Sequence, residues 1–468
     1  MKLPLCLLAV VAVISTFILP VNATDLPEYK VKPFSTLCAN IENQAAYTSG
    51  FLSRMWKIEK GEGEWLVTTG RDFTEEIGIP DLIAKKELSR LIRYLNQQGT
   101  KLMLVYPPTR GVLYPKQTRA KAFGFNAEGM RQSYLQTLQS FRQLGAYVPA
   151  LEDAFKYKED FLFFPKDSHW SQKGAIFYAK RIAEQMDQLG FTDKGESRFQ
   201  TTYSGIVANG ENVLIGVEGV CGYSFPRLFV KTHVTTELAS GDDLFSTKQT
   251  NEPHIVLLGT SFSAQSRFNF AGYLQQFANT SVADFSITGG GFTGAWINYL
   301  KSGEFGRQKP DLIIWEVPGW WQFEARYFDA ILPYFQNGCD SSNAMMRASQ
   351  VSLDPINGAK SALFSTQFTH VASKNLLLDI RLDNSLVENV RLRAWFSSGL
   401  SKAFRLRREP GTQSDGRFLG NLGLDHNYTD QGVVAIDVES IEYANNVEIP
   451  QRLRGDIRLC KSSLPYAD

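Results

Sequence analysis

The chain has 468 residues, 43% of them hydrophobic, and a formal net charge of +1 at pH 7. That length allows two or three domains of about 100–200 residues each. The ordinary composition argues against a disordered chain, and the near-neutral charge gives no global sign of a nucleic-acid partner, so a charged ligand must be recognised by local patches.

The N-terminus has the pattern of a secretory signal peptide. Lys2 precedes an apolar run over residues 3–19, and residues 21–23 end it with a cleavage-like sequence. We therefore expect residues 1–23 to be removed after Ala23. The alternative is an uncleaved anchor helix, but the run is short for a membrane span and contains Pro4. No later segment is long and apolar enough to cross a membrane.

Cysteine usage agrees with export. Cys6 leaves with the signal peptide, and Cys38, Cys221, Cys339 and Cys460 remain. Four cysteines allow three pairings, and an oxidising compartment favours disulfides. We predict Cys38–Cys221 and Cys339–Cys460, each within its own half of the chain. The spacing contains no Cys-x-x-Cys pair and no nearby histidine, so no zinc site is expected.

The first part of the mature chain alternates apolar runs with amphipathic helical patterns. One helical pattern runs from Asp81 to Gly99, and the apolar run that follows, at residues 101–106, ends at Pro107. Such alternation is typical of a parallel α/β sheet. Residues 195–250 are rich in Gly, Thr and Ser, and we expect an irregular insertion or lid there. The remaining predicted elements are helices at 128–144 and 171–186 and strands at 146–150, 254–258, 281–287 and 311–317.

The pattern changes after about residue 345. Helical periodicity disappears, and short alternating segments separated by Gly, Asn, Asp and Pro take over. This pattern predicts a C-terminal all-β sandwich over residues 345–468, after a catalytic domain over residues 24–344. The predicted strands of the sandwich are residues 375–382, 390–396, 403–407, 432–438 and 456–460.

An acid and a histidine lie two residues apart in Phe-Pro-Lys-Asp-Ser-His-Trp, directly before a predicted helix. Asp167 and His169 would share one side of an extended segment. The mature chain has five histidines, and among them His169 alone combines an acid partner with a place at a strand end. A purely structural histidine, with Trp170 packed in the core, is the alternative.

A hydroxyl that could act as a nucleophile follows another predicted strand. Ser261 lies just after the aliphatic run at residues 255–258 and Gly259, where open α/β sheets place their sites. Taken alone, Ser261 is more simply explained as part of a turn and helix cap. Taken together, the three residues predict a catalytic triad in which His169 removes the proton of Ser261, and Asp167 orients the imidazole and stabilises its charged form.

Two further strand ends carry candidates for a substrate pocket. Gly289 and Gly290, in Thr-Gly-Gly-Gly-Phe, allow a close backbone approach and are candidate oxyanion donors, although a plain turn is the alternative. Arg110 follows the strand at residues 101–106 and is a candidate for binding a substrate carboxylate, with a surface ion pair as the alternative.

A basic aromatic strand in the C-terminal part predicts a polyanionic ligand. Alternation places Arg391, Arg393 and Trp395 on one face, and residues 391–408 contain no acid. Guanidinium groups beside an aromatic ring suit sugars that bear carboxylates, and a solvated basic face is the alternative. Lys402 and Arg405 complete the candidate polysaccharide-binding set.

These motifs together resemble the periplasmic alginate O-acetyltransferases. The resemblance rests on Asp-x-His-Trp, Gly-Thr-Ser-x-Ser, Pro-Thr-Arg-Gly, Gly-Gly-Gly-Phe and Ile-Trp-Glu, and it covers essentially the whole mature chain. It implies an SGNH-hydrolase-like domain followed by a carbohydrate-binding module, and acetyl transfer to mannuronate units of alginate before export. Carried over by motif, Ser261 is the nucleophile, His169 the base and Asp167 its orienting acid.

Two departures from related patterns stand out. Ordinary SGNH hydrolases carry the serine early and the acid and histidine late, whereas here the order is Asp, His, Ser. The resembled family also tends to have tyrosines near the positions of Phe268 and Trp321, whose rings lack a phenolic hydroxyl. We count both residues as pocket candidates.

The sequence thus predicts a periplasmic acetyltransferase with an acetyl-serine intermediate and no cofactor. Its expected partners are the alginate polymer, a membrane-associated acetyl donor and proteins of the export complex, with no nucleic acid. A polysaccharide acetylesterase and a non-catalytic polymer-binding scaffold are the alternatives.

Overall fold

A computed structural model describes residues 37–464, apart from residues 158–160, 223, 239–253, 337, 340–343, 355–358, 365–370, 410, 413, 423–427, 429, 445–451 and 463. The predicted signal peptide lies outside the described residues. Within them, no helix combines the length and the apolar character that crossing a membrane requires.

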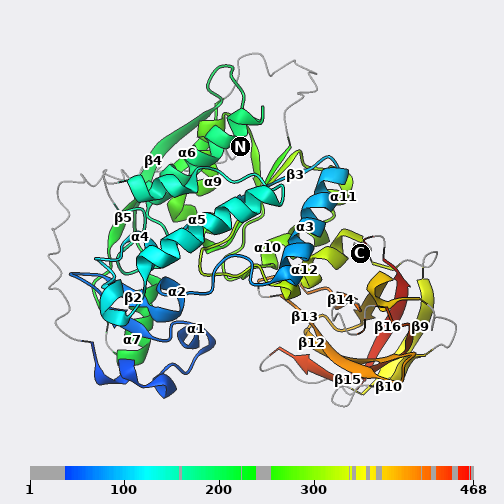
Figure 1. Cartoon of the computed structure of the whole chain (residues 1–468). Coiled ribbons are helices and arrows are strands. Elements are labelled where there is room, and N and C mark those ends of the chain that lie inside the picture. Colours follow the sequence, from blue (N-terminus) through cyan, green and yellow to red (C-terminus); the bar gives the residue numbers. More distant parts are fainter. Residues whose placement is uncertain are drawn as a thin grey trace, which may run out of the picture.

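A four-stranded parallel sheet forms the centre of the N-terminal α/β domain (Figure 1). Its strands lie in the order β3-β8-β6-β7, and all adjacent pairs are parallel. The three strands β3, β6 and β8 are covered on both faces, which explains their unbroken apolar sequences. Because the strands are parallel, their carboxyl ends meet at one edge. The bounds are β3 Lys101–Val105, β6 Ile255–Leu258, β7 Val282–Asp284 and β8 Leu312–Glu316.

The predicted strand at residues 146–150 is wrong. Tyr147 pairs with Met103 through a single isolated bridge, and no strand forms around it. Pro149 has no N–H to continue a ladder, and the chain turns into a short 3-10 helix at Leu151–Lys156.

Helices pack around this sheet, and three of them, α3, α5 and α6, begin and end within two residues of the predicted bounds. The Asp81 carboxylate accepts the Ala84 N–H at the start of α3, and the Ser171 hydroxyl accepts the Gly174 N–H at the start of α6. Helix α6 packs against α9, and α3 against α12. The helix bounds are α3 Leu82–Gln97, α5 Ala127–Gln143, α6 Gln172–Gln188, α9 Phe270–Ala278, α10 Gly294–Lys301 and α12 Ala325–Ile331.

Several short helices and strands lie between these longer elements in the sequence. They are α1 Gly50–Ser53, β1 Ile58–Lys60, β2 Leu66–Thr68, α2 Thr69–Asp72, α4 Arg110–Leu113, α8 Ser261–Ala264 and α11 Glu304–Arg307.

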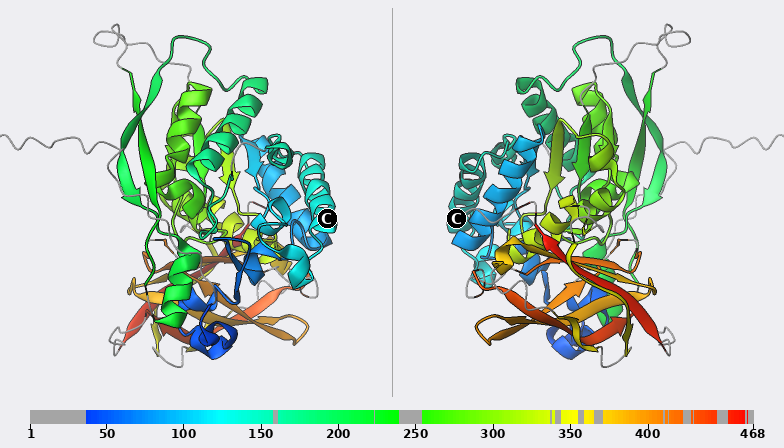
Figure 2. Two further views of the ribbon diagram at one scale, coloured as in Figure 1. Left: turned by 90° about the vertical axis from the view of Figure 1, so that its left-hand side faces the viewer. Right: turned by 90° about the vertical axis from the view of Figure 1, so that its right-hand side faces the viewer.

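The predicted irregular insertion is largely regular where it is described. Strands β4 (Phe199–Ala208) and β5 (Phe229–Glu237) form an antiparallel ribbon, and α7 (Asn212–Cys221) lies between them in sequence. The ribbon runs along the outer edge of the α/β domain and contacts α9 (Figure 2). Its Thr- and Ser-rich strands are partly exposed, so the apolar alternation that marks a strand is weak there.

The C-terminal domain consists of two four-stranded antiparallel sheets with one apolar core between them. One sheet has the order β10-β15-β12-β13 and the other β14-β11-β16-β9. The five predicted strands coincide with β11, β12, β13, β15 and β16, whereas β9, β10 and β14 were missed. The bounds are β9 Ala344–Leu353, β10 Ala359–Phe364, β11 Leu376–Leu382, β12 Val387–Phe396, β13 Ser401–Arg407, β14 Arg417–Asn421, β15 Val433–Tyr443 and β16 Leu453–Lys461.

Both predicted disulfides are confirmed. Cys38–Cys221 ties the end of α7 to the first described residues, beside a small separate core, and Cys339–Cys460 joins the chain after α12 to β16. Each closes a loop of more than a hundred residues, so each removes conformational freedom from the unfolded chain.

Candidate functional site

The structure brings Ser261, His169 and Asp167 together in one hydrogen-bonded chain. His169 Nε2 lies 2.7 Å from Ser261 Oγ, and His169 Nδ1 lies 2.6 Å from Asp167 Oδ1. Asp167 is fully buried and His169 nearly so, whereas Ser261 is partly exposed. The carboxylate is thus shielded from water, while the hydroxyl at the other end of the chain remains accessible.

The acid and the histidine lie on a tight loop, so the prediction of an extended segment is wrong. Phe163 and Trp170 form an antiparallel bridge that closes the loop, and residues between them turn. Asp167 Oδ1 also accepts the backbone N–H of His169 at 3.1 Å, which sets their relative position locally. Trp170 is buried against Phe262 and Phe270, as the packing alternative predicted.

Arg110 is buried beneath this loop and binds its backbone, so its side chain is not available to a ligand. Its side chain is 1% exposed and donates two hydrogen bonds to the Asp72 carboxylate, at 2.8 and 2.6 Å. It also donates to the backbone carbonyls of Phe164, Pro165 and Asp167. Both expectations for Arg110, a substrate contact and a surface ion pair, are therefore corrected: it forms a buried ion pair that fixes the loop of Asp167 and His169, the candidate catalytic loop.

The surroundings of Asp167 favour its charged form. Burial raises the pKa of this carboxyl, but the charge of His169, the two hydrogen bonds from His169 and the charge of Arg267 together lower the pKa to about 2. Arg267 Nη2 lies 3.5 Å from Asp167 Oδ2.

Phe268, a pocket candidate, is fully buried, and its ring centre lies 5.6 Å from that of His169. It therefore packs against the imidazole rather than facing a substrate.

Glu316 supports the turn that carries Ser261, although it was not among the predicted site residues. Its fully buried carboxylate accepts the Thr260 N–H at 2.7 Å and the Thr260 and Ser263 hydroxyls at 3.1 and 3.0 Å. Burial raises the pKa of Glu316 to about 7 against the opposing effect of these bonds. An acid that directly ends a buried strand, in Ile-Trp-Glu, was the available signal.

Helix α7 supports the other half of the site. Asn212 accepts the Ser168 N–H at 2.9 Å and donates to the Ser168 hydroxyl at 2.7 Å. Lys166 Nζ lies 3.6 Å from the Glu211 carboxylate, and the Lys166 carbonyl accepts the Leu214 N–H. Helix α7 therefore anchors the loop of Asp167 and His169 and is itself tied to Cys38 by a disulfide. The lid role of residues 195–250 stays a prediction.

Ser261 and His169 open on a cleft of about 970 Å³ between the two domains, which we call the interdomain cleft. Trp320, Trp321 and Gly289 line it on the α/β side, and Arg405 to Arg407 of β13 line it on the other. Gly290 is buried and donates its N–H to the Ile287 carbonyl at 3.4 Å, so Gly289 remains the glycine candidate that faces the cleft. Its φ of +79° is one that favours glycine.

Charges in the interdomain cleft are mostly positive. Five arginines line it against two carboxylates, Asp329 and Glu409. Glu409 also joins the two domains, because it accepts the Thr293 hydroxyl at 2.6 Å. The cleft therefore suits an anionic ligand. The lining arginines are Arg54, Arg71, Arg326, Arg405 and Arg407.

The strand face predicted to bind a polysaccharide is present, but acids of a neighbouring strand neutralise part of its positive charge. Arg391, Arg393 and Trp395 project from one face of β12, with Arg405 opposite Arg391 on β13. Acids of the neighbouring strand β15 pair with them: Arg391 with Glu442, Arg393 with Glu439, and the Trp395 ring N–H with Asp437. Lys402 does not join this face, since it pairs in register with the core residue Ala394.

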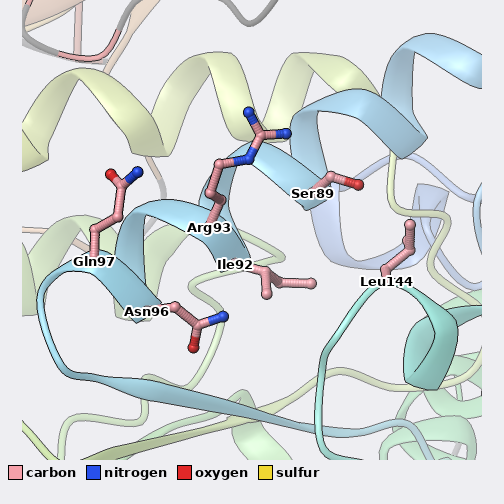
Figure 3. Close-up of a pocket in the computed structure, with 6 residues that line it drawn as sticks. All are labelled: Ser89, Ile92, Arg93, Asn96, Gln97 and Leu144. Atoms are coloured by element: carbon pink, nitrogen blue, oxygen red, sulfur yellow. The ribbon is translucent and has the colours of Figure 1, made fainter.

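A second hollow, on the surface of α3, has no comparable chemistry (Figure 3). Its volume is about 440 Å³, and its polar lining consists of Ser89, Arg93, Asn96 and Gln97. No acid or histidine lines it, so it offers no acid–base pair. Within the described ranges, no three His, Cys, Asp or Glu side chains lie together as metal ligands either.

A Ser–His–Asp chain of this geometry can activate a hydroxyl for attack on an acyl group. The imidazole accepts the hydroxyl proton, and the buried carboxylate stabilises the resulting imidazolium. All three residues lie at the carboxyl edge of the parallel sheet, where such sheets place their sites.

One group of known proteins resembles this chain over almost its whole length, and a second group over about half of it. It is 26% identical over 443 residues to the alginate biosynthesis protein AlgX of Pseudomonas aeruginosa, covering 93% of this chain and 91% of that protein. It is 27% identical over 240 residues to the probable alginate O-acetylase AlgJ of the same species, covering 48% of this chain and 60% of that one. The solved structure of Pseudomonas aeruginosa AlgX has the same fold, with a TM-score of 0.77 at 24% identity, over 91% of this chain and 100% of that one.

Two family models divide the chain as the two domains do. Residues 338–466 match a C-terminal carbohydrate-binding module. Residues 58–319, more than half of the chain, match the family described as an SGNH hydrolase-like domain, acetyltransferase AlgX. The chain therefore belongs to the AlgX family of SGNH hydrolase-like acetyltransferases.

Proposed function

We propose that this protein is a periplasmic O-acetyltransferase that acetylates mannuronate residues of alginate through an acetyl-serine intermediate on Ser261. The observation that carries the proposal is the hydrogen-bonded chain from Ser261 through His169 to the buried Asp167, opening on a cleft with a positively charged lining. The names of the relatives, an alginate biosynthesis protein and a probable alginate O-acetylase, support the choice of polymer.

In the first half-reaction His169 Nε2 takes the proton of Ser261 Oγ as this oxygen attacks the acetyl carbonyl carbon of a donor ester. The tetrahedral intermediate collapses when its bond to the donor oxygen breaks, and that oxygen leaves with the proton from His169. The Gly289 N–H is our candidate for stabilising the oxyanion, because this glycine lines the cleft beside Ser261.

In the second half-reaction a sugar hydroxyl replaces the donor. His169 takes the proton of that hydroxyl, whose oxygen attacks the acetyl-serine carbonyl, and Ser261 Oγ regains a proton as it leaves. Asp167 stays ionised throughout, in keeping with its lowered pKa, and balances each transient imidazolium. Water in place of the sugar would give an acetylesterase, so retention of the acceptor in the cleft separates the two reactions.

The β domain would hold the polymer while the α/β domain acetylates it. Arg391, Arg393 and Trp395 offer an exposed ring beside guanidinium groups, and the match to a carbohydrate-binding module supports a polysaccharide ligand. The acetyl donor would come from a membrane-associated partner of the export complex. Two disulfides and the signal-peptide pattern support the periplasm as the compartment.

Mass spectrometry of the protein after brief exposure to an activated acetyl ester tests the mechanism. We expect one acetyl adduct on Ser261, lost on addition of mannuronate oligomers as acetylated sugar forms. Ser261→Ala should give no adduct, whereas Ser266→Ala, at an exposed serine nearby, should behave as the wild type. Free acetate as the sole product with oligomers present would favour the esterase, and normal acetylation by Ser261→Ala would favour the non-catalytic scaffold.

A further inference from the structure

Arg71 differs from the other arginines of the interdomain cleft. Arg54, Arg326, Arg405 and Arg407 are exposed, whereas Arg71 is partly buried. Burial lowers the pKa of Arg71 to about 10, which still leaves it charged at neutral pH. A cation withdrawn from water in this way usually has an anion beside it.

The charges of Asp72 and Asp167 act on Arg71 from a distance, but no described carboxylate pairs with it directly. The neighbouring Asp72 is committed to Arg110, and Asp167 to His169 and Arg267. Arg71 itself makes a long hydrogen bond of 3.4 Å to the Ser168 hydroxyl and lies 5.5 Å from the ring centre of Trp320. No described carboxylate lies within 4.0 Å of its nitrogens.

The position of Arg71 relates it to the reacting groups. Ser168 immediately precedes His169, and Trp320, Ser261 and His169 line the same cleft. The Trp320 ring also lies 5.6 Å from that of Phe262, the residue after Ser261. A guanidinium and an indole ring side by side can bind the carboxylate and the ring face of one uronic acid residue, whose hydroxyls would then lie near Ser261.

We propose that Arg71 and Trp320 form an acceptor subsite that binds the carboxylate of the uronate residue being acetylated. The subsite rests on the proposed function and adds to it a basis for selecting acidic over neutral sugars. Arg71 would fill the carboxylate-binding role for which Arg110 was one candidate.

The test compares acetyl transfer to mannuronate oligomers and to the same oligomers as methyl esters. We expect the wild type to prefer the free acids, mainly through a lower KM, and Arg71→Met to reduce that preference roughly tenfold or more. Arg71→Lys should restore part of it, because it keeps the charge without the planar fork. Arg93→Met, at an exposed arginine of the hollow in Figure 3, should leave the preference unchanged.

The proposal and the proposed function fail in different ways. If the wild type acetylates neither acceptor, the proposed function is wrong. If it acetylates both and Arg71→Met keeps the full preference for free acids, the subsite is wrong. An equal loss on both acceptors would also overturn the subsite, since it would indicate that Arg71 only supports the fold.

Discussion

Two charged regions differ in how far they are exposed to water. We call the carboxyl edge of the parallel sheet around Asp167, His169 and Ser261 the proposed catalytic edge. We call the face of β12 that carries Arg391, Arg393 and Trp395 the basic face. At the catalytic edge the Arg110–Asp72 pair is 1% and 2% exposed. On the basic face the Arg391–Glu442 pair is 50% and 38% exposed. Removing one partner of a buried ion pair lowers the free energy of unfolding strongly, because water cannot solvate the charge that remains. An exposed ion pair contributes little to that free energy.

This difference in exposure suits the two regions to different roles. In the proposed mechanism, the buried contacts of the catalytic edge would keep Ser261, His169 and Asp167 aligned through both half-reactions. In the proposed function, the basic face would exchange its exposed ion pairs for contacts with the polymer. Substitutions at the first region should therefore affect rate or stability strongly, and those at the second should affect polymer affinity modestly.

The largest expected effect is that of Asp167→Asn on the rate. An asparagine fits the space but can present its NH₂ group to His169 Nδ1, which favours the tautomer that cannot accept the Ser261 proton. We expect acetyl transfer from an activated ester to slow by roughly 10³–10⁴-fold. Measuring the first-order formation of the acetyl adduct checks this, and a loss below about tenfold would remove Asp167 from the proposed triad.

The next effect is on stability and compares the two kinds of ion pair directly. Arg110→Met leaves the Asp72 carboxylate buried without its partner and frees the carbonyls of the catalytic loop. We expect a loss of about 3–5 kcal/mol in the free energy of unfolding, measured by denaturant titration. Arg307→Met, which breaks an exposed pair with Glu304, should have little measurable effect. Similar losses in both variants would contradict the contrast between the regions.

Glu316 gives a pH-dependent version of the same test. Burial raises its pKa from 4.5 in the unfolded chain to about 7 in the folded one, and the nearby charge of Asp284 acts in the same direction. The folded state therefore keeps a proton that the unfolded state releases. This favours folding below pH 4.5, and the benefit is lost as the pH rises from 4.5 to about 7.

Glu316→Gln cannot ionise and should escape that loss. Relative to the wild type, the variant should gain about 3 kcal/mol of stability between pH 4.5 and pH 8, the free-energy equivalent of the pKa shift. Denaturant titration at several pH values measures the gap. Glu304→Gln, at a helix end on the surface, provides the control. A gap that does not change with pH would mean that Glu316 ionises normally.

Features set by local sequence could be predicted, whereas the burial and pairing of charged side chains could not. The parallel sheet, the three long helices α3, α5 and α6, and both disulfides could be predicted from apolar periodicity, helix caps and the even number of cysteines. Ser261, His169 and Asp167 could be grouped because Ser261 directly follows β6 and the other two share the Asp-x-His-Trp motif. The position of Arg110 could not, since a buried and an exposed arginine look alike in sequence and its partner Asp72 lies 38 residues away.

The net charge of the basic face could not be predicted from its own sequence either. Residues 391–408 contain no acid, but β15 brings Glu439 and Glu442 beside them across the sheet. Strand pairing between distant segments therefore decides the local charge. Lys402 was misplaced for a related reason: its side of the sheet depends on its register with Ala394.

The smallest expected effect is on polymer affinity. Trp395 is 40% exposed, so replacing Trp395 and Arg391 by alanine removes an aromatic surface and one cation without opening the core. We expect the dissociation constant for polymannuronate to rise roughly tenfold, while acetyl transfer from a model ester to short oligomers continues. Tyr203→Ala, at a 55% exposed aromatic residue of β4, is the matched control. If both variants retain the polymer equally in affinity electrophoresis, the β12 face is not the binding surface, and the interdomain cleft itself must hold the polymer.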